Sequence, residues 1–463
     1  MNGDTRVWIR GFDGTYFASL RELGRFREGC YWTPTVNTDS LEVGWSVVVR
    51  RALCLEPRKR GFRIRLERGQ ELGVSEDEPF FTIDPTNARI VPVKARDLAI
   101  GMPVIAPYDL STIARVWERD LATIDLRRVL TRGPRAGARW TVFLDGECLT
   151  NRLRSTRLPI DFPVSDDFLY VVGLWLAEGG KSRESPRATL QFSVGAIPGA
   201  VNALKRFFCS YNAPPCSKGN GFDCSVQSSV FAAVFEHLGL FGTAKRGDKR
   251  FPAFFWNLSQ RQRRTMIAGL WDGDGSHVFH GQSVLAQKSH ALIHDVAASF
   301  LLDGIFPIVK PGRHSQLLLF VNRARDFRIL ADTYPFGHVS KRLDYQYQAS
   351  RQGRDKATGL WKCSGIWDAV GKACLPPGER TRIYNRGGKY DRGVRAQRSA
   401  FRGVPALRSL ADSKLAFLRV AEIDAAPEDD AYELCVGTED SVIANGVLVR
   451  VASRPECQPN RTI

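Results

Sequence analysis

Two similar apolar segments of the chain each end in an acid that glycine follows directly, Glu178-Gly179 and Asp274-Gly275. Residues 171–179 and 267–275 share seven identical or similar positions, so they form an internal repeat. A carboxylate at a helix C-terminus faces unpaired carbonyl oxygens and the negative end of the helix dipole, which costs roughly 0.3 to 1 kcal/mol unless a positive charge compensates it. Two such carboxylates side by side would be hard oxygen donors of the kind that Mg²⁺ prefers.

The elements that must position these acids are two helices with a glycine near the middle of each apolar stretch, Gly173 and Gly269. Each glycine gives up about 1 kcal/mol of helix propensity relative to alanine, which is reasonable where two helices approach closely. Packing the helices side by side would bring Glu178 and Asp274 together. The alternative is a pair of ordinary buried helices with glycine caps, but the duplication favours a shared site. Asp272 is expected to be a solvated neighbour rather than a third ligand.

Composition restricts the partner. The 463 residues include 66 Lys or Arg against 49 Asp or Glu, a net charge of +17 that favours a polyanion, first of all nucleic acid. No apolar run is long enough to span a membrane, and the start of the sequence is unlike a signal peptide, so we expect a soluble, cytoplasmic, DNA-associated protein with no membrane partner. The ten cysteines form no CxxC pair, which favours free thiols; zinc binding by Cys363 and Cys374 stays open.

The chain changes character along its length, and this predicts several domains. Residues 1–110 and 412–453 contain short runs of strand-forming residues, residues 111–160 form an Arg-rich bridge with an expected helix at 124–130, and residues 161–347 alternate helical and strand patterns. Between residues 341 and 408 there are 16 Lys or Arg and five acids. We therefore expect 111–160 to be a basic linker or DNA-recognition region and 348–411 to be a basic, Gly- and Arg-rich insertion.

The repeated segments resemble the signature helices of the LAGLIDADG (DOD-type) homing endonucleases in their two-motif form. Leu158-Pro159 before the first segment and Lys249-Arg250-Phe251-Pro252 before the second extend this resemblance. It implies an α+β endonuclease domain over 161–347, with two pseudo-symmetric αββαββα halves at about 161–245 and 246–347. Two motifs in one chain imply a monomer that binds double-stranded DNA.

The same resemblance implies roles for individual residues. Glu178 and Asp274 would bind Mg²⁺ or Mn²⁺, with two or more ions at the domain centre that activate water and stabilise the leaving oxygen. Basic residues would flank this site, and the candidates are Lys288, Arg323 and Arg325 in the second half and Lys218 in the first. The helix interface is expected to contain Gly173, Gly269, Gly179 and Gly275. Lys249 and Arg250 are expected to contact DNA. The basic composition of 341–408, rather than the resemblance, adds Lys341, Arg342, Arg382, Arg386 and Lys389, with a merely solvated insertion as the alternative.

Both ends of the chain resemble a Hint domain, the horseshoe-shaped all-β fold of inteins, over residues 1–110 and 412–453. The residues that carry this resemblance are Gly3–Val7, Val74–Phe81 and Ile443–Val451. Splicing requires a nucleophilic Cys or Ser, a His and a terminal His-Asn pair; here Met1, Glu78 and Arg450-Val451 occupy these degenerate splicing positions. A thioether cannot act as the nucleophile and a valine side chain cannot cyclise, so splicing should be absent.

These observations predict a free-standing, intein-derived homing endonuclease, a phosphodiester hydrolase that makes a metal-dependent double-strand cut in a long specific DNA site. One alternative is a DNA-binding regulator on the same fold with weak or no catalysis. An intron-RNA maturase and an active splicing intein are the other hypotheses.

Overall fold

The computed structural model describes residues 1–12, 14–26, 30–84, 89–114, 119–131, 142–152, 155–181, 189–195, 197–217, 223–241, 249–350, 408–409, 412–437 and 439–451. The chain divides into two compact units. Unit 1 is Met1–Val116, Phe300–Phe306 and Gly353–Ile463, and unit 2 is Trp117–Ser299 and Pro307–Gln352. No helix within the described ranges is long and apolar enough to cross a membrane.

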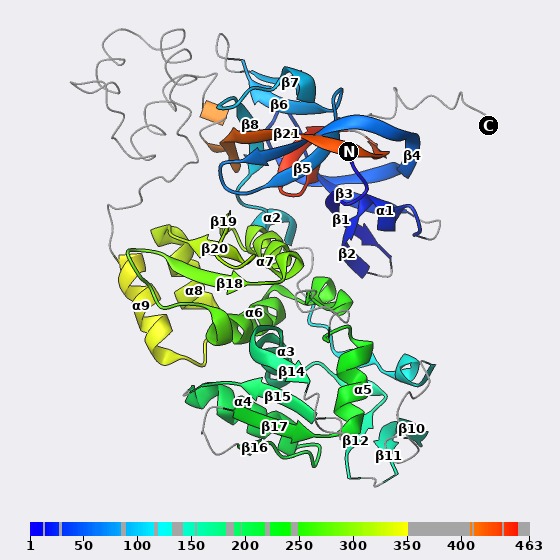
Figure 1. Ribbon diagram of the computed structural model, residues 1–463, viewed down its shortest axis with the longest axis vertical. Coiled ribbons are helices and arrows are strands. Elements are labelled where there is room, and N and C mark those ends of the chain that lie inside the picture. Colours follow the sequence, from blue (N-terminus) through cyan, green and yellow to red (C-terminus); the bar gives the residue numbers. More distant parts are fainter. Residues whose placement is uncertain are drawn as a thin grey trace. The chain divides into compact units, whose positions relative to one another are not determined.

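Unit 1 contains a sheet of 11 strands to which both ends of the chain contribute, as predicted (Figure 1). The strands run in the order β7-β6-β23-β22-β1-β3-β4-β21-β8, while β2 pairs with β1 and β5 pairs with β4. The strands are β1 (Arg6–Gly11), β2 (Gly14–Ser19), β3 (Tyr31–Val36), β4 (Val43–Leu66), β5 (Glu71–Ser75), β6 (Pro79–Ile83), β7 (Ile90–Lys94), β8 (Pro103–Pro107), β21 (Leu415–Val436), β22 (Ser441–Ala444) and β23 (Val447–Arg450). The helical turns are α1 (Leu20–Leu23), η1 (Ala95–Asp97) and α2 (Ser111–Ala114).

Strand β4 is continuous over 24 residues, although the sequence pattern predicts only short strands in this part of the chain. It stays continuous because β21 pairs with it antiparallel along most of its length, with several register shifts. Such shifts increase local twist and bend a strand pair. The sequence around residue 55 has no alternating pattern, which is why the continuity is visible only in the paired structure.

Unit 2 is mixed α/β and contains the repeated segments. Its helices are α3 (Asp166–Glu178), α4 (Pro198–Cys209), α5 (Ser229–His237), α6 (Gln260–Asp274), α7 (His290–Leu302, whose last residues belong to unit 1), α8 (Ala324–Thr333) and α9 (Val339–Ser350), with the 3₁₀ turns η3 (Arg127–Thr131) and η5 (Ala253–Asn257). Its strands are β9 (Thr123–Asp125), β10 (Val142–Asp145), β11 (Cys148–Asn151), β12 (Arg157–Pro159), β13 (Asp161–Pro163), β14 (Gly179–Lys181), β15 (Thr189–Ser193), β16 (Cys216–Ser217), β17 (Asp223–Gln227), β18 (Ser283–Gln287), β19 (Ile308–Pro311) and β20 (Leu317–Val321).

The repeat is visible in the order of the elements. The first half follows α3-β14-β15-α4-β16-β17-α5, the expected αββαββα order, and its four strands form the sheet β14-β15-β17-β16. The second half begins with α6 and forms the three-stranded sheet β18-β20-β19, because the strand expected after the helix is reduced to the isolated bridges Gly275–Leu285 and Phe279–Gln282.

Each signature helix begins at a serine N-cap. Ser165 accepts a hydrogen bond from the Phe168 amide at the start of α3, and Ser259 with Gln262 forms a capping box at the start of α6. These caps satisfy amide groups that have no partner within the helix. Both helices therefore start at a fixed residue, which also fixes the position of the acid that ends each one.

The described part of residues 119–160 differs from the linker and helix predicted for this stretch. Residues 123–125 form β9, which pairs with β13, and residues 127–131 form a 3₁₀ turn rather than an α-helix. Leu126, Leu149 and Leu158 are fully buried. This stretch therefore contributes to the core of unit 2, a result that its high arginine content obscures.

Candidate active site

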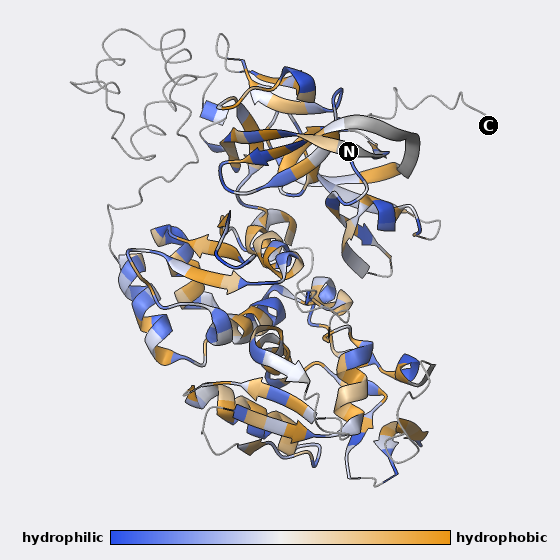
Figure 2. Ribbon diagram, viewed as in Figure 1, coloured by the Kyte–Doolittle hydropathy of each residue, from blue (hydrophilic) through white to orange (hydrophobic). Residues whose placement is uncertain are grey.

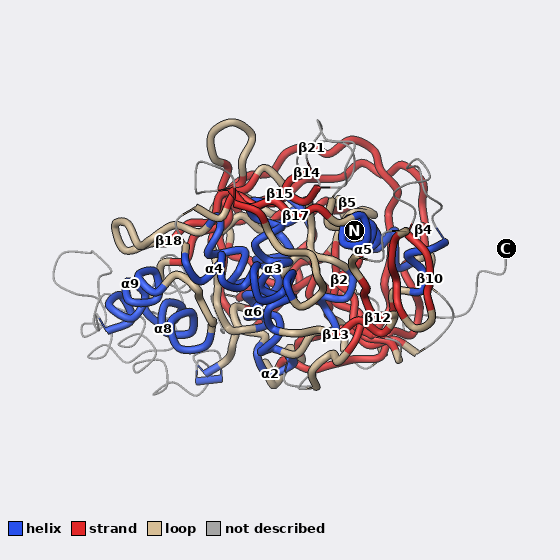
Figure 3. The backbone as a smooth tube through the Cα atoms, turned by 90° about the horizontal axis from the view of Figure 1, so that it is seen from below, coloured by secondary structure: helices blue, strands red, loops and turns tan. Residues whose placement is uncertain are grey.

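The helices α3 and α6 pack with their backbones in direct contact, and Figures 1 and 3 both show them side by side. A Cβ atom on Gly173 would overlap the Met266 carbonyl oxygen, and one on Gly269 would overlap the Tyr170 carbonyl oxygen. A Cβ atom on Gly273 would lie 2.5 Å from the Cβ atom of Ala177. Only glycine fits at the first two positions, so these residues set the distance between the helices.

Gly179 and Gly275 have a different role from the interface role expected of them. Both follow their helix with extended backbones, at φ −74° and ψ 139° and at φ −74° and ψ 140°. These angles are open to every residue type. The nearest atoms to an added Cβ belong to a tryptophan of the same helix, Trp175 or Trp271. Each glycine therefore lacks a side chain that would overlap the tryptophan of its own helix. The contact between the helices depends on Gly173, Gly269 and Gly273.

Glu178 and Asp274 come together at the ends of these helices. Burial, the charge of Glu178 and a hydrogen bond with Glu178 raise the pKa of Asp274 to about 8, although Lys249 and Lys341 act in the opposite direction. Asp274 is half-buried and Glu178 is exposed. Two carboxyl groups in hydrogen-bonding contact cannot both ionise without repulsion, so they share a proton that a divalent cation could displace.

Two lysines cap the ends of the two helices. The Lys249 ammonium donates to the carbonyl oxygens of Trp175, Leu176 and Gly179, at 2.9, 3.2 and 2.8 Å. Burial lowers the pKa of Lys249 to about 8, while the charges of Asp274 and Glu178 oppose this shift. A cation here satisfies orphan carbonyls and offsets the helix dipole.

Lys341 makes the corresponding contact at the end of α6. Its ammonium donates to the carbonyl oxygens of Trp271 and Asp272, both at 2.9 Å, and its side chain is almost fully buried. Burial also lowers the pKa of Lys341, against the charges of Asp272 and Asp274. The sequence pattern predicts DNA contacts for Lys249 and Lys341, and it does not reveal this capping position.

Gln287 is a further residue of the site that the sequence does not reveal. It ends β18, and its side-chain amide donates to the Asp274 carboxylate. This contact holds one oxygen of Asp274 and orients the carboxylate. No local pattern marks Gln287, because a single glutamine at a strand end has many other uses.

Asp272 is buried, which corrects the expectation of a solvated neighbour. It is 1% exposed, and its carboxylate accepts hydrogen bonds from the Tyr170 hydroxyl and the Gly337 amide, both at 2.6 Å. Burial raises the pKa of Asp272. Because Tyr170 lies on α3 and Asp272 on α6, this bond ties the two halves of unit 2 together and points Asp272 away from the role of a metal ligand.

The other predicted cations that the structure describes lie in different environments. Arg323 is buried and forms a short two-point ion pair with Asp326 at the start of α8, so it does not match the catalytic role expected of it. Lys288, Arg325 and Arg342 are exposed, and Arg250 lies 3.8 Å from buried Asp295. Lys218, Arg382, Arg386 and Lys389 lie outside the described residues, as do Cys363, Cys374 and most of 348–411.

In unit 1, two of the predicted splicing positions, Met1 and Glu78, are in contact. The Met1 ammonium contacts the Glu78 carboxylate at 2.6 Å, and Met1 is 2% exposed. Strand β23 pairs with β6 at Val449 and Phe80. Arg450 forms an ion pair with Asp440 at 3.1 Å.

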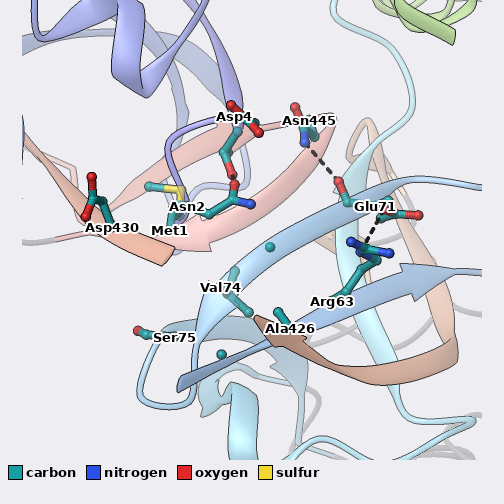
Figure 4. A pocket seen from close by; sticks show the side chains of 13 residues that line it. Met1, Asn2, Asp4, Arg63, Glu71, Val74, Ser75, Ala426, Asp430 and Asn445 are labelled. Atoms are coloured by element: carbon teal, nitrogen blue, oxygen red, sulfur yellow. Dashed lines mark hydrogen bonds and ion pairs between the residues drawn. The ribbon is translucent and has the colours of Figure 1, made fainter. Parts of the chain in front are cut away.

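A cavity of about 340 Å³ opens beside Met1, where Asp4, Glu71, Asp430 and Asn445 are among its lining residues (Figure 4). Asn445 is held in place: its amide donates to the Glu71 carbonyl at 2.8 Å and its side-chain oxygen accepts from the Arg6 amide at 2.9 Å. The cavity wall thus includes three carboxylates and two amides, and no cysteine or histidine is among the described residues that line it.

Known proteins resemble parts of this chain in fold or in sequence. No protein-family model matches the chain. The solved structures similar to it include homing endonucleases. One is I-DmoI in complex with DNA and Mn, which is 17% identical, has a TM-score of 0.28 and covers 37% of this chain and 97% of that one. Another is I-WcaI bound to its DNA recognition sequence, at 11% identity and a TM-score of 0.28, covering 37% of this chain and 81% of that one.

Two further proteins are similar to this chain, one in structure and one in sequence. The N-terminal LAGLIDADG domain of DUF199/WhiA is 12% identical, with a TM-score of 0.27, and covers 37% of this chain and 84% of that one. In sequence, the chain is 22% identical over 295 residues to the DNA-directed RNA polymerase subunit Rpo1C of Methanocaldococcus jannaschii. The match covers 61% of this chain and spans 31% of the length of that protein.

The donor set at Glu178 and Asp274 fits a divalent cation. Both side chains offer carboxylate oxygens, and their mutual repulsion is the energetic reason to bind one. Among the residues that the structure describes, no group of three or more His, Cys, Asp or Glu side chains gathers as a metal site. The chain therefore offers two carboxylates, and water or a bound phosphate would supply the remaining oxygen ligands.

Proposed function

We propose that unit 2 is a metal-dependent DNA endonuclease of the LAGLIDADG type that cuts both strands of a long specific site. The observation that carries this proposal is the meeting of Glu178 and Asp274 at the ends of two helices that touch through glycine. The net charge of +17 supports a nucleic-acid partner.

In this proposal Glu178 and Asp274 hold Mg²⁺ or Mn²⁺. A bound divalent ion would polarise a phosphodiester and lower the pKa of a bound water molecule. Residues of the chain would orient the metal ligands and stabilise the charge on the phosphate. Gln287 orients the Asp274 carboxylate, and Lys249 and Lys341 keep a positive charge beside the acids while holding the helix ends in place. Such fixed charges need little reorganisation when negative charge develops on a phosphate.

The test is a cleavage selection on a randomised duplex library with Mg²⁺, run in parallel with EDTA. We expect the full chain to enrich one long asymmetric sequence that is cut on both strands only when Mg²⁺ is present. The double variant Glu178→Gln/Asp274→Asn should bind the enriched duplex but leave it intact. Sequence-specific binding with no nick in Mg²⁺ or Mn²⁺ would instead identify a DNA-binding regulator, and preference for folded RNA would favour a maturase.

We also propose that unit 1 is an intein-derived scaffold that does not splice. Met1 and Val451 supply neither a nucleophile nor a cyclising amide, and Glu78 is engaged by the Met1 ammonium. Mass spectrometry of the chain fused between two carrier proteins tests this directly. We expect one intact fusion mass, whereas joined carriers with a released central segment would contradict the proposal.

A further inference from the structure

The sheets of the two halves differ in the chemistry of their outer faces. In each sheet one face is buried under helices: in the first, Leu190 and Phe192 point inward, and Phe192 packs on Phe208 of α4 with ring centroids 5.8 Å apart. In the second sheet Leu285 and Leu319 are buried. Because side chains alternate along a strand, the residues between these point to the opposite face.

The outer face of the first sheet carries hydrogen-bonding groups. The ladder places Gln191 beside Ser225, Ser193 beside Asp223 and Thr189 beside Gln227. The Ser193 hydroxyl donates to the Asp223 carboxylate at 2.8 Å, and Gln191 and Gln227 remain at least partly exposed.

The outer face of the second sheet is apolar. The ladder places Val284, Phe320 and Ile308 in one row across the three strands, and Ala286, Leu318 and Lys310 in the next. All of these side chains except exposed Lys310 are half-buried, so the face is partly open. Figure 2 shows the same contrast, since β18 and β20 are mostly coloured as hydrophobic while β15 and β17 alternate.

Cations border this apolar face. Lys288 follows β18, Lys310 lies on β19 and Arg313 lies in the turn before β20, and all three are exposed. No acidic residue occurs in residues 283–288 or 308–321. A second copy of this chain would bring the same cations against these, whereas a polyanion would be attracted to them.

The width of the face also fits DNA. Three strands spaced about 4.8 Å apart present a surface about 10 Å wide, while the major groove is about 12 Å wide. Within that groove the C5 methyl group of thymine is the apolar feature among hydrogen-bonding edges. An apolar face bordered by cations therefore suits thymine methyl groups at its centre and phosphates at its edges.

We propose that the two sheets recognise their half-sites by different chemistry: β15 and β17 through hydrogen bonds, and β18, β20 and β19 through contacts of Val284, Ile308, Leu318 and Phe320 with thymine methyl groups. The half-site under the second sheet is then rich in thymine. This inference rests on the proposed DNA-cleaving function, because it assumes that these faces meet DNA.

The test uses the unaltered protein and the duplex enriched from the randomised library, with binding measured in Ca²⁺ to prevent cutting. Thymine is replaced by deoxyuridine in one half of the duplex at a time, which removes the methyl group and leaves base pairing unchanged. Deoxyuridine should weaken binding in one half by about four-fold for each methyl group that touches the sheet, and have little effect in the other half. Equal sensitivity in both halves, or in neither, would overturn the inference while leaving the nuclease proposal intact.

Two variants connect the effect to the sheet. Phe320→Ser should abolish most of the deoxyuridine sensitivity, and the matched variant Gln191→Ala on the first sheet should preserve it. Thermal melting of both variants separates weaker DNA recognition from unfolding. If Phe320→Ser melts early, Val284→Ser on the neighbouring strand serves the same purpose. Retained sensitivity in a folded Phe320→Ser or Val284→Ser variant would contradict the proposal.

Failure to enrich or bind any duplex would overturn the DNA-cleaving function and this inference together.

Discussion

The two halves of unit 2 place the same parts in different surroundings. Each has a glycine-bearing helix that ends in an acid, a glycine after that acid, and a lysine that caps the final carbonyl groups. Asp274, however, is half-buried and bound by Gln287, while Glu178 is exposed. The repeated elements thus bring two carboxylates to one point, and the residues around each acid make the two environments unequal.

A similar contrast separates the two tryptophans that precede the acids. The Trp175 indole donates to the Leu240 carbonyl at 2.8 Å, whereas the Trp271 indole donates to the Tyr345 hydroxyl at 2.7 Å. The indole N–H at this position of the repeat therefore donates to a backbone carbonyl in the first half and to a side-chain hydroxyl in the second. The duplication therefore keeps the two tryptophans at equivalent positions, although their hydrogen-bond partners differ.

The largest expected effect comes from neutralising one acid at a time. Glu178→Gln and Asp274→Asn should each lower the cleavage rate by about 100-fold or more, since several kcal/mol of charge stabilisation depend on the shared ion. Single-turnover cleavage of the enriched duplex measures this loss. Asp332→Asn on the exposed face of α8 is the control and should cut normally. If either variant cut at the wild-type rate, that acid would have no part in the site.

Replacing either of the two lysines that cap the helix ends should have the next largest effect. Lys249→Met and Lys341→Met each leave buried carbonyl groups without a donor and should lower the free energy of unfolding by about 1 to 3 kcal/mol. Cleavage should also fall, with Lys249→Met the more severe, because the charges of both Glu178 and Asp274 act on Lys249. Denaturant unfolding and cleavage rates measure the two effects. Lys205→Met, at an exposed lysine of α4, is the control; an equal decrease in that variant would show that a general charge effect is responsible.

The helix contact can be broken from either side. Gly173→Ala and Gly269→Ala should each lower the free energy of unfolding by about 1 to 3 kcal/mol, because the added methyl group overlaps a carbonyl oxygen of the opposite helix. Gly180→Ala is a matched control, since a Cβ atom there meets nothing within 4 Å. Similar melting temperatures for all three variants would contradict the backbone contact.

Stability should also depend on pH in the metal-free protein. The pKa of Asp274 is raised to about 8 in the folded state, above its ordinary value of about 4 when unfolded, so the folded state binds more protons between these values. Its contribution to stability is then present below about pH 4 and is lost as the pH rises toward 8. Urea unfolding at several pH values should show this decline, and Asp274→Asn should reduce it. An unchanged profile in Asp274→Asn would assign the decline to another group.

The sequence predicts the central pair well, because duplication marks it. Gly173 and Gly269 occupy matching positions in the repeat, as do Glu178 and Asp274. Packing the two helices through their glycines therefore brings the acids at their ends together. The shared sheet of unit 1 was also predictable from its runs of strand-forming residues at both ends of the chain, and the structure confirms it.

The residues around the acids were harder to predict because they come from distant parts of the chain. Lys249 and Lys341 follow their acids by 71 and 67 residues, and no local pattern marks either lysine as a helix cap. Asp272 looked solvated beside Asp274 because its partners, Tyr170 and Gly337, are 102 and 65 residues away. Burial of a single charged residue depends on such distant partners, and spacing within one helix does not reveal them.

Metal binding tests the central claim most directly. Electron paramagnetic resonance of Mn²⁺ titrated into the protein bound to its enriched duplex, with duplex alone subtracted, measures the ions held at the site. We expect tight Mn²⁺ binding that weakens by at least about ten-fold in Glu178→Gln and in Asp274→Asn and remains unchanged in Asp332→Asn. Equal Mn²⁺ affinity in the wild type and in both acid variants would show that the two helix ends do not form a metal site.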